Sequence, residues 1–449
     1  MFAMLTMLTN ASVKLVNRYL PSSFVFSIIL TLIAFAAGLI LTGQDILSMA
    51  GHWGNGLWSL HGFAMQMALI LITGYALANA PFIQRFLDAM ADKVHSPKAA
   101  IIIVTLVAMA GALINWGFGL VISAVFARSL AKKVTKVDYP LLVASAYSGF
   151  LVWHSGLSGS IPLALSSGGD TLKQLSGDIL TDAIPLSQTI FAPYNLAILI
   201  TLIVVIPILN SFMHPKNPTL VDPSILKNEV YQAPKHDTPA QKLDDSRLIA
   251  FVLLALALMY YVNEFTSNGF SLGFNIVIGL FLFMGLLAHG TLERYYLAVN
   301  SGISSITGIV LLYPFYGGIM GIMTGANLNG ISISTEVTEF FINNASADSF
   351  PVFAFLSAGI VNVFVPSGGG QFAVQGPVMI PAGTALGVNP SVTAMAIAWG
   401  DAWTNMIQPF WALPLLGIAG LDARAIMGYC LIVLAVSGLV IMGGLWFLV

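Results

Sequence analysis

Long apolar runs separated by short polar segments dominate the hydrophobic pattern of this chain. The runs are continuous rather than alternating, which is typical of helices and not of membrane β-strands. Phe24–Leu41 and Leu196–Leu209 are two examples, and runs near ~20 residues match the ~30 Å hydrocarbon core of a bilayer. Because lipid offers no partner to backbone polar groups, such runs cross it as helices. The pattern therefore predicts an all-α polytopic membrane protein.

We expect about ten transmembrane helices in addition to two apolar stretches that do not fit a single span. The clearest spans fall at about 22–42, 62–81, 140–165, 191–212, 248–264, 272–290, 302–326, 390–417 and 425–447.

The two remaining stretches, about 99–131 and 351–386, are predicted to be re-entrant hairpins. The first is basic on both flanks yet too short for two spans and a turn, so we expect its tip at Asn115–Gly119. One span followed by a basic loop on the wrong side is the alternative. The second centres on Pro366-Ser-Gly-Gly-Gly-Gln371, a sequence that a continuous spanning helix disfavours.

The positive charges assign a side of the membrane to each loop. Lys14 and Arg18 place the N-terminus in the cytoplasm, before a first run that we interpret as a retained span rather than a signal peptide. On this topology Lys173 is the only one of 17 Lys and Arg residues outside. The expected location is a bacterial inner membrane.

The amino-acid composition limits the classes of protein to which the chain can belong. The chain is 57% hydrophobic and 8% charged, which excludes a soluble domain of this size. Its net charge of −2 indicates no nucleic-acid partner, and the single Cys430 excludes an intrachain disulfide. The sequence contains no paired Asp-rich motif, no His cluster at metal spacing and no Gly-x-Ser-x-Gly elbow. We therefore expect no enzyme and no cofactor. A channel is a further alternative, but hairpins in opposite orientations favour a carrier.

The chain divides at its one polar linker into halves 1–212 and 248–449, with residues 213–247 as a cytoplasmic connection. In the first half Pro162 follows Asn115 by 47 residues, and in the second Pro409 follows Asn362 by the same 47. Charge sidedness gives the two units opposite orientations. Paired, interrupted segments in inverted halves indicate the binding site of a secondary transporter.

Asp401 is the clearest ionisable candidate within a span, and intramembrane ionisable groups suggest function. It shares one helix face with three polar residues at i+3, i+4 and i+7. Their oxygens can hold Na⁺, or His154 can titrate in a proton-coupled cycle; the alternative for Asp401 is a structural hydrogen bond between helices. The candidate ion-coupling residues are Asp401, Thr404, Asn405 and Gln408, with no other metal ligands.

The two hairpin tips suit an anion, because a broken helix exposes N–H groups and the positive end of its dipole. Neither tip carries Lys or Arg, which favours a monocarboxylate over a dicarboxylate. Close helix packing is the alternative role for the glycines. The candidate substrate-binding residues are Asn115, Gly117, Gly119, His154, Ser155, Ser158, Asn362, Ser367, Gly368, Gly369, Gly370 and Gln371.

Three motifs resemble the bacterial short-chain fatty-acid transporter family of the ion-transporter superfamily: Asn115-Trp-Gly-Phe-Gly119, Trp153-His-Ser-Gly-Leu-Ser-Gly-Ser-Ile-Pro162 and Val365-Pro-Ser-Gly-Gly-Gly-Gln-Phe372. The resemblance covers essentially the whole chain. It implies uptake of acids such as butyrate or acetoacetate, coupled to H⁺ or Na⁺, by a homodimer that moves like an elevator. A dicarboxylate or an amino acid is the alternative substrate. Dicarboxylate relatives carry Ser-Asn-Thr at their tips, whereas these tips read Asn-Trp-Gly and Ser-Gly-Gly-Gly.

Overall fold

The computed structural model describes residues 23–223, 238–268, 273–362 and 367–449, and the regular elements among them are all helices. The first half contains α2 (Ser23–Thr42), α3 (Ile46–Gly56), α4 (His61–Ala78), α5 (Pro81–Ala91), α6 (Pro97–Ile114), α7 (Trp116–Lys133), α8 (Tyr139–Ser148), η1 (Gly149–Ser155), α9 (Ser160–Ser167), α10 (Gly169–Leu175), η2 (Leu186–Gln188) and α11 (Pro193–Phe212). The linker contains α12 (Pro239–Asp244). The second half, beginning at the end of the linker, contains α13 (Arg247–Asn268), α14 (Phe274–His289), α15 (Leu292–Ser301), η3 (Ile303–Ile306), α16 (Thr307–Thr324), α17 (Ile333–Asn344), α18 (Phe350–Asn362), α19 (Gly368–Ala385), α20 (Pro390–Thr404), η4 (Asn405–Ile407), α21 (Pro409–Ala419) and α22 (Ala423–Phe447).

Several described segments are long and apolar enough to cross a bilayer. Six qualify by themselves, namely α4, α6, α11, the joined α12–α13, α16 and α22. The pair α14–α15 qualifies only as one bent unit: α14 has 16 residues and α15 has 10, and the two helices meet at 117°. The all-α polytopic prediction is confirmed, and the expected count of about ten spans stays a prediction.

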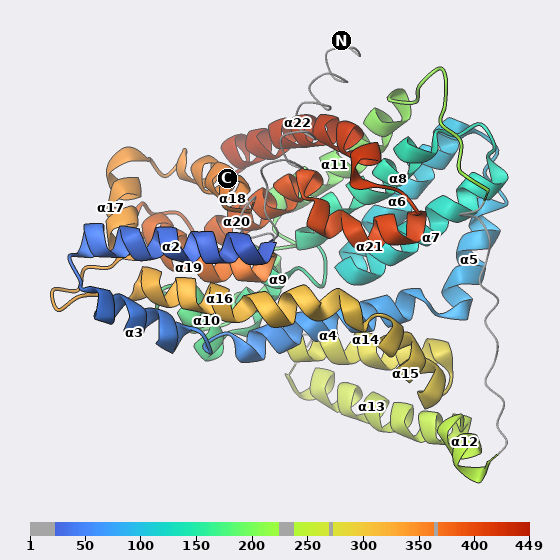
Figure 1. The fold of residues 1–449 in the computed structure, drawn as a ribbon, viewed down its shortest axis with the longest axis horizontal. Coiled ribbons are helices and arrows are strands. Elements are labelled where there is room, and N and C mark those ends of the chain that lie inside the picture. The colour runs from blue at the N-terminus through green and yellow to red at the C-terminus, as the bar shows by residue number, and fades with distance from the viewer. Residues whose placement is uncertain (1–22, 224–237, 269–272, 363–366) are drawn as a thin grey trace.

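The helices form two groups that pack against each other (Figure 1). One group contains α2–α4 and α13–α17, with α13 at its outer edge. The other contains α6–α11 and α18–α22. Contacts of α4 with α7 and of α16 with α19 join the groups. Most of the largest fully buried side chains, including Trp153 and Trp399, lie in the second group, whereas Tyr313 and Tyr316 of α16 lie in the first.

Two segments expected to be single helices are each divided by a turn of 3₁₀ helix. The prediction at 140–165 corresponds to α8, η1 and α9, and the prediction at 390–417 corresponds to α20, η4 and α21. At the first break the chain packs against the end of α6, where the Leu157 N–H donates to the Leu113 carbonyl oxygen at 2.7 Å. Glycine at position 156 allows this approach, because a Cβ there would lie 2.5 Å from the same oxygen. At the second break Pro409 has no N–H to continue a helical ladder.

The same order of elements occurs twice. A helix pair joined at a break (α6–α7, α18–α19) precedes a divided helix (α8–α9, α20–α21) and then a long apolar helix (α11, α22). The first pair breaks at Asn115, whose side chain caps α7 by accepting the Phe118 N–H at 3.0 Å. In the second pair α18 is described as far as Asn362 and α19 begins at Gly368, and the expected turn residue Pro366 lies outside the described residues. Inverted orientation and re-entrance of the pairs stay predictions.

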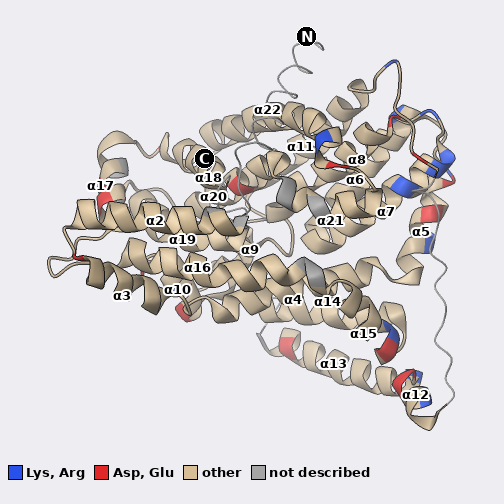
Figure 2. Cartoon of the chain, viewed as in Figure 1, with Lys and Arg blue, Asp and Glu red and all other residues tan. Residues whose placement is uncertain are grey.

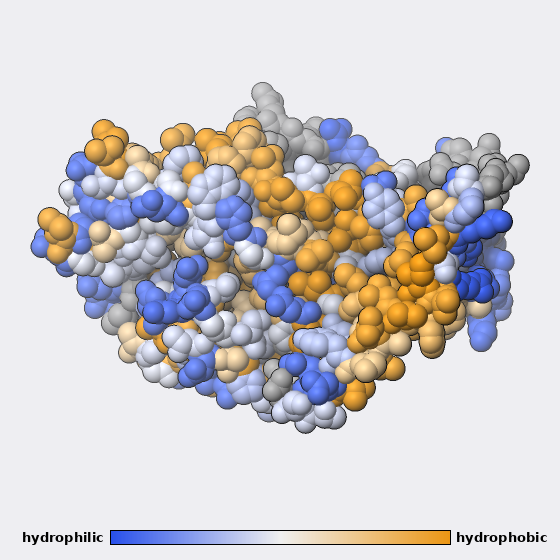
Figure 3. Space-filling model, turned by 90° about the horizontal axis from the view of Figure 1, so that it is seen from below, coloured by the Kyte–Doolittle hydropathy of each residue, from blue (hydrophilic) through white to orange (hydrophobic). Residues whose placement is uncertain are grey.

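The surface separates by charge and by hydropathy. Figure 2 shows Lys and Arg gathered at the end that carries α5, α7, α12 and α15, whereas α3 and α17 at the opposite end contain none. Seen from below, apolar side chains gather over α13 (Figure 3), where Leu248 and Met259 are 72% and 69% exposed. An apolar helix with so little protein cover requires lipid or another subunit around it.

Gly149 tests how closely the divided helix α8–α9 packs on α6. A Cβ there would overlap Ala108 Cβ and lie 2.7 Å from Met109 N. Gly149→Ala should therefore lower the midpoint of heat-induced loss of monodisperse protein in detergent, by overpacking of about 1–3 kcal/mol. Gly443→Ala in α22 is the control, since a Cβ there meets nothing within 4 Å, and replacing a helical Gly should be neutral or stabilising. Equal midpoints for the two variants would refute the packing argument.

Candidate functional site

A buried acid–base pair lies where the two divided helices meet. His154, near the end of η1, and Asp401, one turn before η4, approach to 3.1 Å between Nε2 and Oδ2. Their side chains are 1% and 0% exposed. A buried carboxylate is costly unless it is paired and hydrogen-bonded. The pair therefore links the first half of the chain to the second at the centre of the protein.

Amide side chains complete the environment of Asp401. The Asn362 amide nitrogen, at the end of α18, donates to the Asp401 carbonyl at 2.8 Å and lies 2.7 Å from Asn405 Oδ1. That contact requires the Asn405 oxygen to face Asn362, so its NH₂ faces Asp401 Oδ2 at 3.0 Å. Gln408 Nε2 closes the ring by donating to the Asn362 carbonyl at 3.0 Å. These predicted residues, with Thr404 at 3.0 Å from Asn362 Nδ2, form one network.

The N-terminus of α19 lies directly against His154. A Cβ on Gly368 would lie 2.5 Å from His154 Nε2 and 2.8 Å from Ser160 Oγ, so only glycine fits without displacing the pair. Ser367 caps α19 and also contacts the Tyr313 hydroxyl of α16 at 3.1 Å. A Cβ on Gly369 would come within 2.7 Å of the same hydroxyl. The predicted tip thus touches both helix groups.

Four buried polar atoms of this contact and the adjoining network make no hydrogen bond within the part of the chain that the structure describes: His154 Nδ1, Ser160 Oγ, Asp401 Oδ1 and Asn362 Oδ1. Buried polar atoms are nearly always hydrogen-bonded. Two helix N-termini, those of α9 at Ser160 and α19 at Gly368, also point their positive ends here. The cluster therefore has the chemistry to hold a small anion or to exchange a proton.

The tip between α6 and α7 lies on the other side of the Ser155–Ser160 segment. Trp116 N–H donates to Ser158 Oγ at 2.9 Å, and Asn115 Nδ2 donates to the Ile70 carbonyl of α4 at 3.2 Å. Gly117 lies beside Leu71, while a Cβ on Gly119 would lie 2.5 Å from Ala112 N. Gly119 thus packs where α6 contacts α7. Close helix packing was the alternative role considered for the tip glycines.

Two further predicted residues take part in contacts away from the pair. Gln371 Nε2 donates to the Ala358 carbonyl at 2.8 Å, which ties α19 to α18. Ser155 Oγ lies 3.3 Å from Asn195 Oδ1, which also accepts the Trp399 indole N–H at 2.9 Å. Sequence reasoning missed Asn195, although an Asn inside an apolar span was a usable signal.

Tyrosines were missed as well. The Tyr147 hydroxyl of α8 donates to the carbonyls of Asn405 at 2.5 Å and Gln408 at 3.3 Å, directly at the η4 break. Tyr313 was missed at the α19 tip. Both lie in apolar runs, where a tyrosine resembles ordinary packing. Among the described residues no group of three or more His, Cys, Asp or Glu could hold a metal ion.

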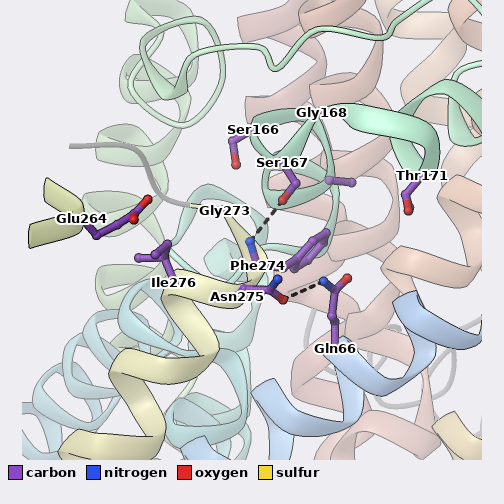
Figure 4. Close-up of a pocket in the computed structure, with 11 residues that line it drawn as sticks. Gln66, Ser166, Ser167, Gly168, Thr171, Glu264, Gly273, Phe274, Asn275 and Ile276 are labelled. Carbon is purple, nitrogen blue, oxygen red and sulfur yellow. Dashed lines mark hydrogen bonds between the residues drawn. The ribbon is translucent and has the colours of Figure 1, made fainter. Parts of the chain in front are cut away.

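A separate polar pocket of about 370 Å³ contains none of the predicted residues (Figure 4). Gln66 of α4 donates to Asn275 at 3.0 Å, and the Phe274 N–H donates to Ser167 Oγ at 3.1 Å across it. Glu264 of α13 lines the same pocket. The pocket joins α4, α9 and α14 and lies apart from the His154–Asp401 pair.

Comparisons with known proteins agree with the motifs. The sequence model of one family, described as Short chain fatty acid transporter, matches residues 4–448. Two curated relatives are both named "Putative short-chain fatty acid transporter". The Escherichia coli K12 protein is 42% identical, and the match covers 96% of this chain and 97% of that protein. The Haemophilus influenzae Rd protein is 39% identical, and the match covers 99% of this chain and 100% of that protein. The solved YdaH transporter of Alcanivorax borkumensis shares the fold, with a TM-score of 0.57 at 11% identity over 95% of this chain and 97% of that one.

A substitution of Tyr147 tests how much its hydrogen bonds contribute to the stability of the folded protein. Tyr147→Phe removes a buried hydroxyl donor from the η4 carbonyls and should cost about 1 kcal/mol, seen as a lower midpoint of thermal loss of monodisperse protein. Tyr194→Phe is the matched control, since the Tyr194 hydroxyl has no partner among the described residues, and its midpoint should not fall. A Tyr147→Phe midpoint equal to that of wild type would mean that this contact does not stabilise the break.

Proposed function

The chain belongs to the short chain fatty acid transporter family, and from this premise we propose that it moves short-chain monocarboxylates together with protons across the bacterial inner membrane. The acids are of the butyrate or acetoacetate type. The observation that carries the proposal is the position of His154, which contacts Asp401 on one side and the α19 tip on the other.

The carboxylate of the substrate binds between Ser160 and Gly368. Both residues begin helices whose positive ends favour an anion, and Ser160 Oγ has a hydrogen bond to offer. The described contacts of this cluster include no Lys or Arg, so one negative charge is better matched than two. Ser158 and the Asn115 tip border the same segment from the other side.

A proton suits the pair better than Na⁺. An ionised carboxylate only accepts, so His154 Nε2 carries the hydrogen that it shares with Asp401, and Nδ1 is the atom that takes up a proton. Asp401 Oδ2 already accepts from Asn405, whose amide turns N–H rather than oxygen toward it. A hard cation requires oxygen ligands in place of those donors. Protonated His154 would balance a second carboxylate, so that substrate and proton cross as a neutral unit.

The movement proposed is an elevator in which the group containing α6–α11 and α18–α22 slides against the group containing α2–α4 and α13–α17. The repeated order of elements supports an inverted repeat, and the two-group arrangement supports a moving and a fixed part. The exposed apolar face of α13 is consistent with a fixed part held in lipid or in a homodimer. The basic end in Figure 2 would face the cytoplasm. Lys14 and Arg18, which lie outside the described residues, assign the N-terminus to the same side by the same rule.

Uptake into proteoliposomes tests substrate and coupling together. Labelled butyrate should accumulate when the outside is more acidic than the lumen, and a Na⁺ gradient alone should not drive it. Unlabelled acetoacetate should compete, whereas a dicarboxylate or an amino acid should not. Accumulation that follows Na⁺ and ignores the pH gradient would overturn proton coupling, and competition by dicarboxylates or amino acids alone would favour the alternative substrates.

Asp401→Asn separates coupling from binding. The isosteric amide keeps hydrogen bonds to its neighbours but removes the charge that opposes His154, so uphill uptake should fall by about tenfold or more while butyrate exchange across the membrane persists. The control is Asp182→Asn, at an exposed carboxyl remote from the pair. Wild-type uphill uptake by a correctly folded Asp401→Asn protein would remove Asp401 from the mechanism.

A further inference from the structure

A second cavity, of about 470 Å³, lies between the two helix groups. Residues of α7 and α21 line one side, and residues of α4, α15 and α16 line the other. Its volume is within the range of small-molecule sites, about 300–1,000 Å³. We call this cavity the chamber.

The chamber is apolar at its deep end and open at its mouth. Leu71, Trp116, Leu120 and Trp411 form the deep end and are 7%, 2%, 3% and 7% exposed. Ser301, Thr307 and Gly417 lie at the mouth and are exposed. None of the described residues that line it is an Asp, Glu, Lys or Arg. Such a surface binds hydrocarbon and gives no counter-charge to a carboxylate.

The deep end adjoins the proposed carboxylate site through one tip. Trp116, at the start of α7, donates its N–H to Ser158 Oγ, two residues before Ser160. Its ring lies 5.2 Å from that of Trp411 and 5.9 Å from that of Trp153, and the Trp153 ring lies 3.6 Å from the His154 ring. Packed, buried aromatic rings therefore lie between the chamber and the acid–base pair.

We infer that the chamber receives the alkyl part of the substrate and sets the longest chain that the protein accepts. The inference rests on the proposed function, because it assigns a place to the chain of a carried monocarboxylate. Leu71 and Val121 face the same space from the two helix groups, so a chain held there contacts both.

The size of the expected effect follows from hydrocarbon transfer. Each methylene buried in the chamber should tighten binding about fourfold, which corresponds to ~0.8 kcal/mol. Half-maximal competition against labelled butyrate should therefore improve along the series acetate, propionate and butyrate. It should stop improving at the length where the chamber is full.

Two substitutions change the space in opposite directions. Val121→Phe fills the chamber and should reduce the ratio of butyrate to acetate affinity by at least fourfold. Leu71→Ala enlarges it and should move the optimum toward valerate and hexanoate. Val204→Phe on α11 is the matched control, because Val204 is 54% exposed and does not line the chamber. Its profile across the acid series should be that of wild type.

The competition experiments distinguish a failure of the chamber assignment from a failure of the proposed function. If wild type is competed by short-chain acids but both chamber variants keep its chain-length profile, the chamber assignment is wrong and the proposed function stands. If no monocarboxylate competes with wild type, the proposed function fails first. Should one chamber variant not fold, as judged by gel filtration in detergent, the other still decides the question. An independent readout is fluorescence: 4-bromobutyrate should quench Trp411 and Trp116 more than 2-bromobutyrate, and equal quenching would oppose the chamber.

Discussion

The carboxyl group of Asp401 lies fully buried in a chain with few charges, and the side chains around it donate hydrogen bonds to its Oδ2. A buried carboxylate has to be met by hydrogen-bond donors, since water is not there to solvate it. His154 and Asn405 supply those donors, and each comes from a 3₁₀ turn. Tyr147 also donates to the carbonyls of Asn405 and Gln408, so the second break and the buried pair belong to one hydrogen-bond network.

This arrangement gives the proposed cycle its logic. Gly368 brings the positive end of α19 against the same imidazole that contacts Asp401. In the proposed cycle, substrate binding at the α19 tip and protonation of the pair therefore both act on the His154 side chain. An anion and a proton that arrive together cancel in charge, which lowers the barrier to moving the site through a medium that excludes charge. The hydrocarbon remainder of the substrate needs only an apolar space, and the chamber beside Trp116 offers one.

Much of the fold could be predicted from the sequence. Apolar runs predicted the helical class. Asp401, Thr404, Asn405 and Gln408, predicted to share one helix face, lie in one hydrogen-bond network, and their part in ion coupling stays a prediction. The breaks within 140–165 and 390–417 were not expected as 3₁₀ turns, because hydropathy reports burial and not backbone conformation. The pairing of His154 with Asp401 joins residues 247 positions apart and required the packing of both halves. Tyr147 and Asn195 were missed for the same reason, since their partners lie far along the chain.

In the proposed cycle one buried pair takes up the proton that travels with the substrate. Infrared difference spectroscopy of the protein in lipid, with butyrate added at constant pH, measures this directly. Imidazole bands of a newly protonated histidine are expected on butyrate binding; they should be lost in His154→Gln and retained when the exposed His61 is replaced by Gln. Butyrate binding without any change in histidine or carboxyl bands would contradict it.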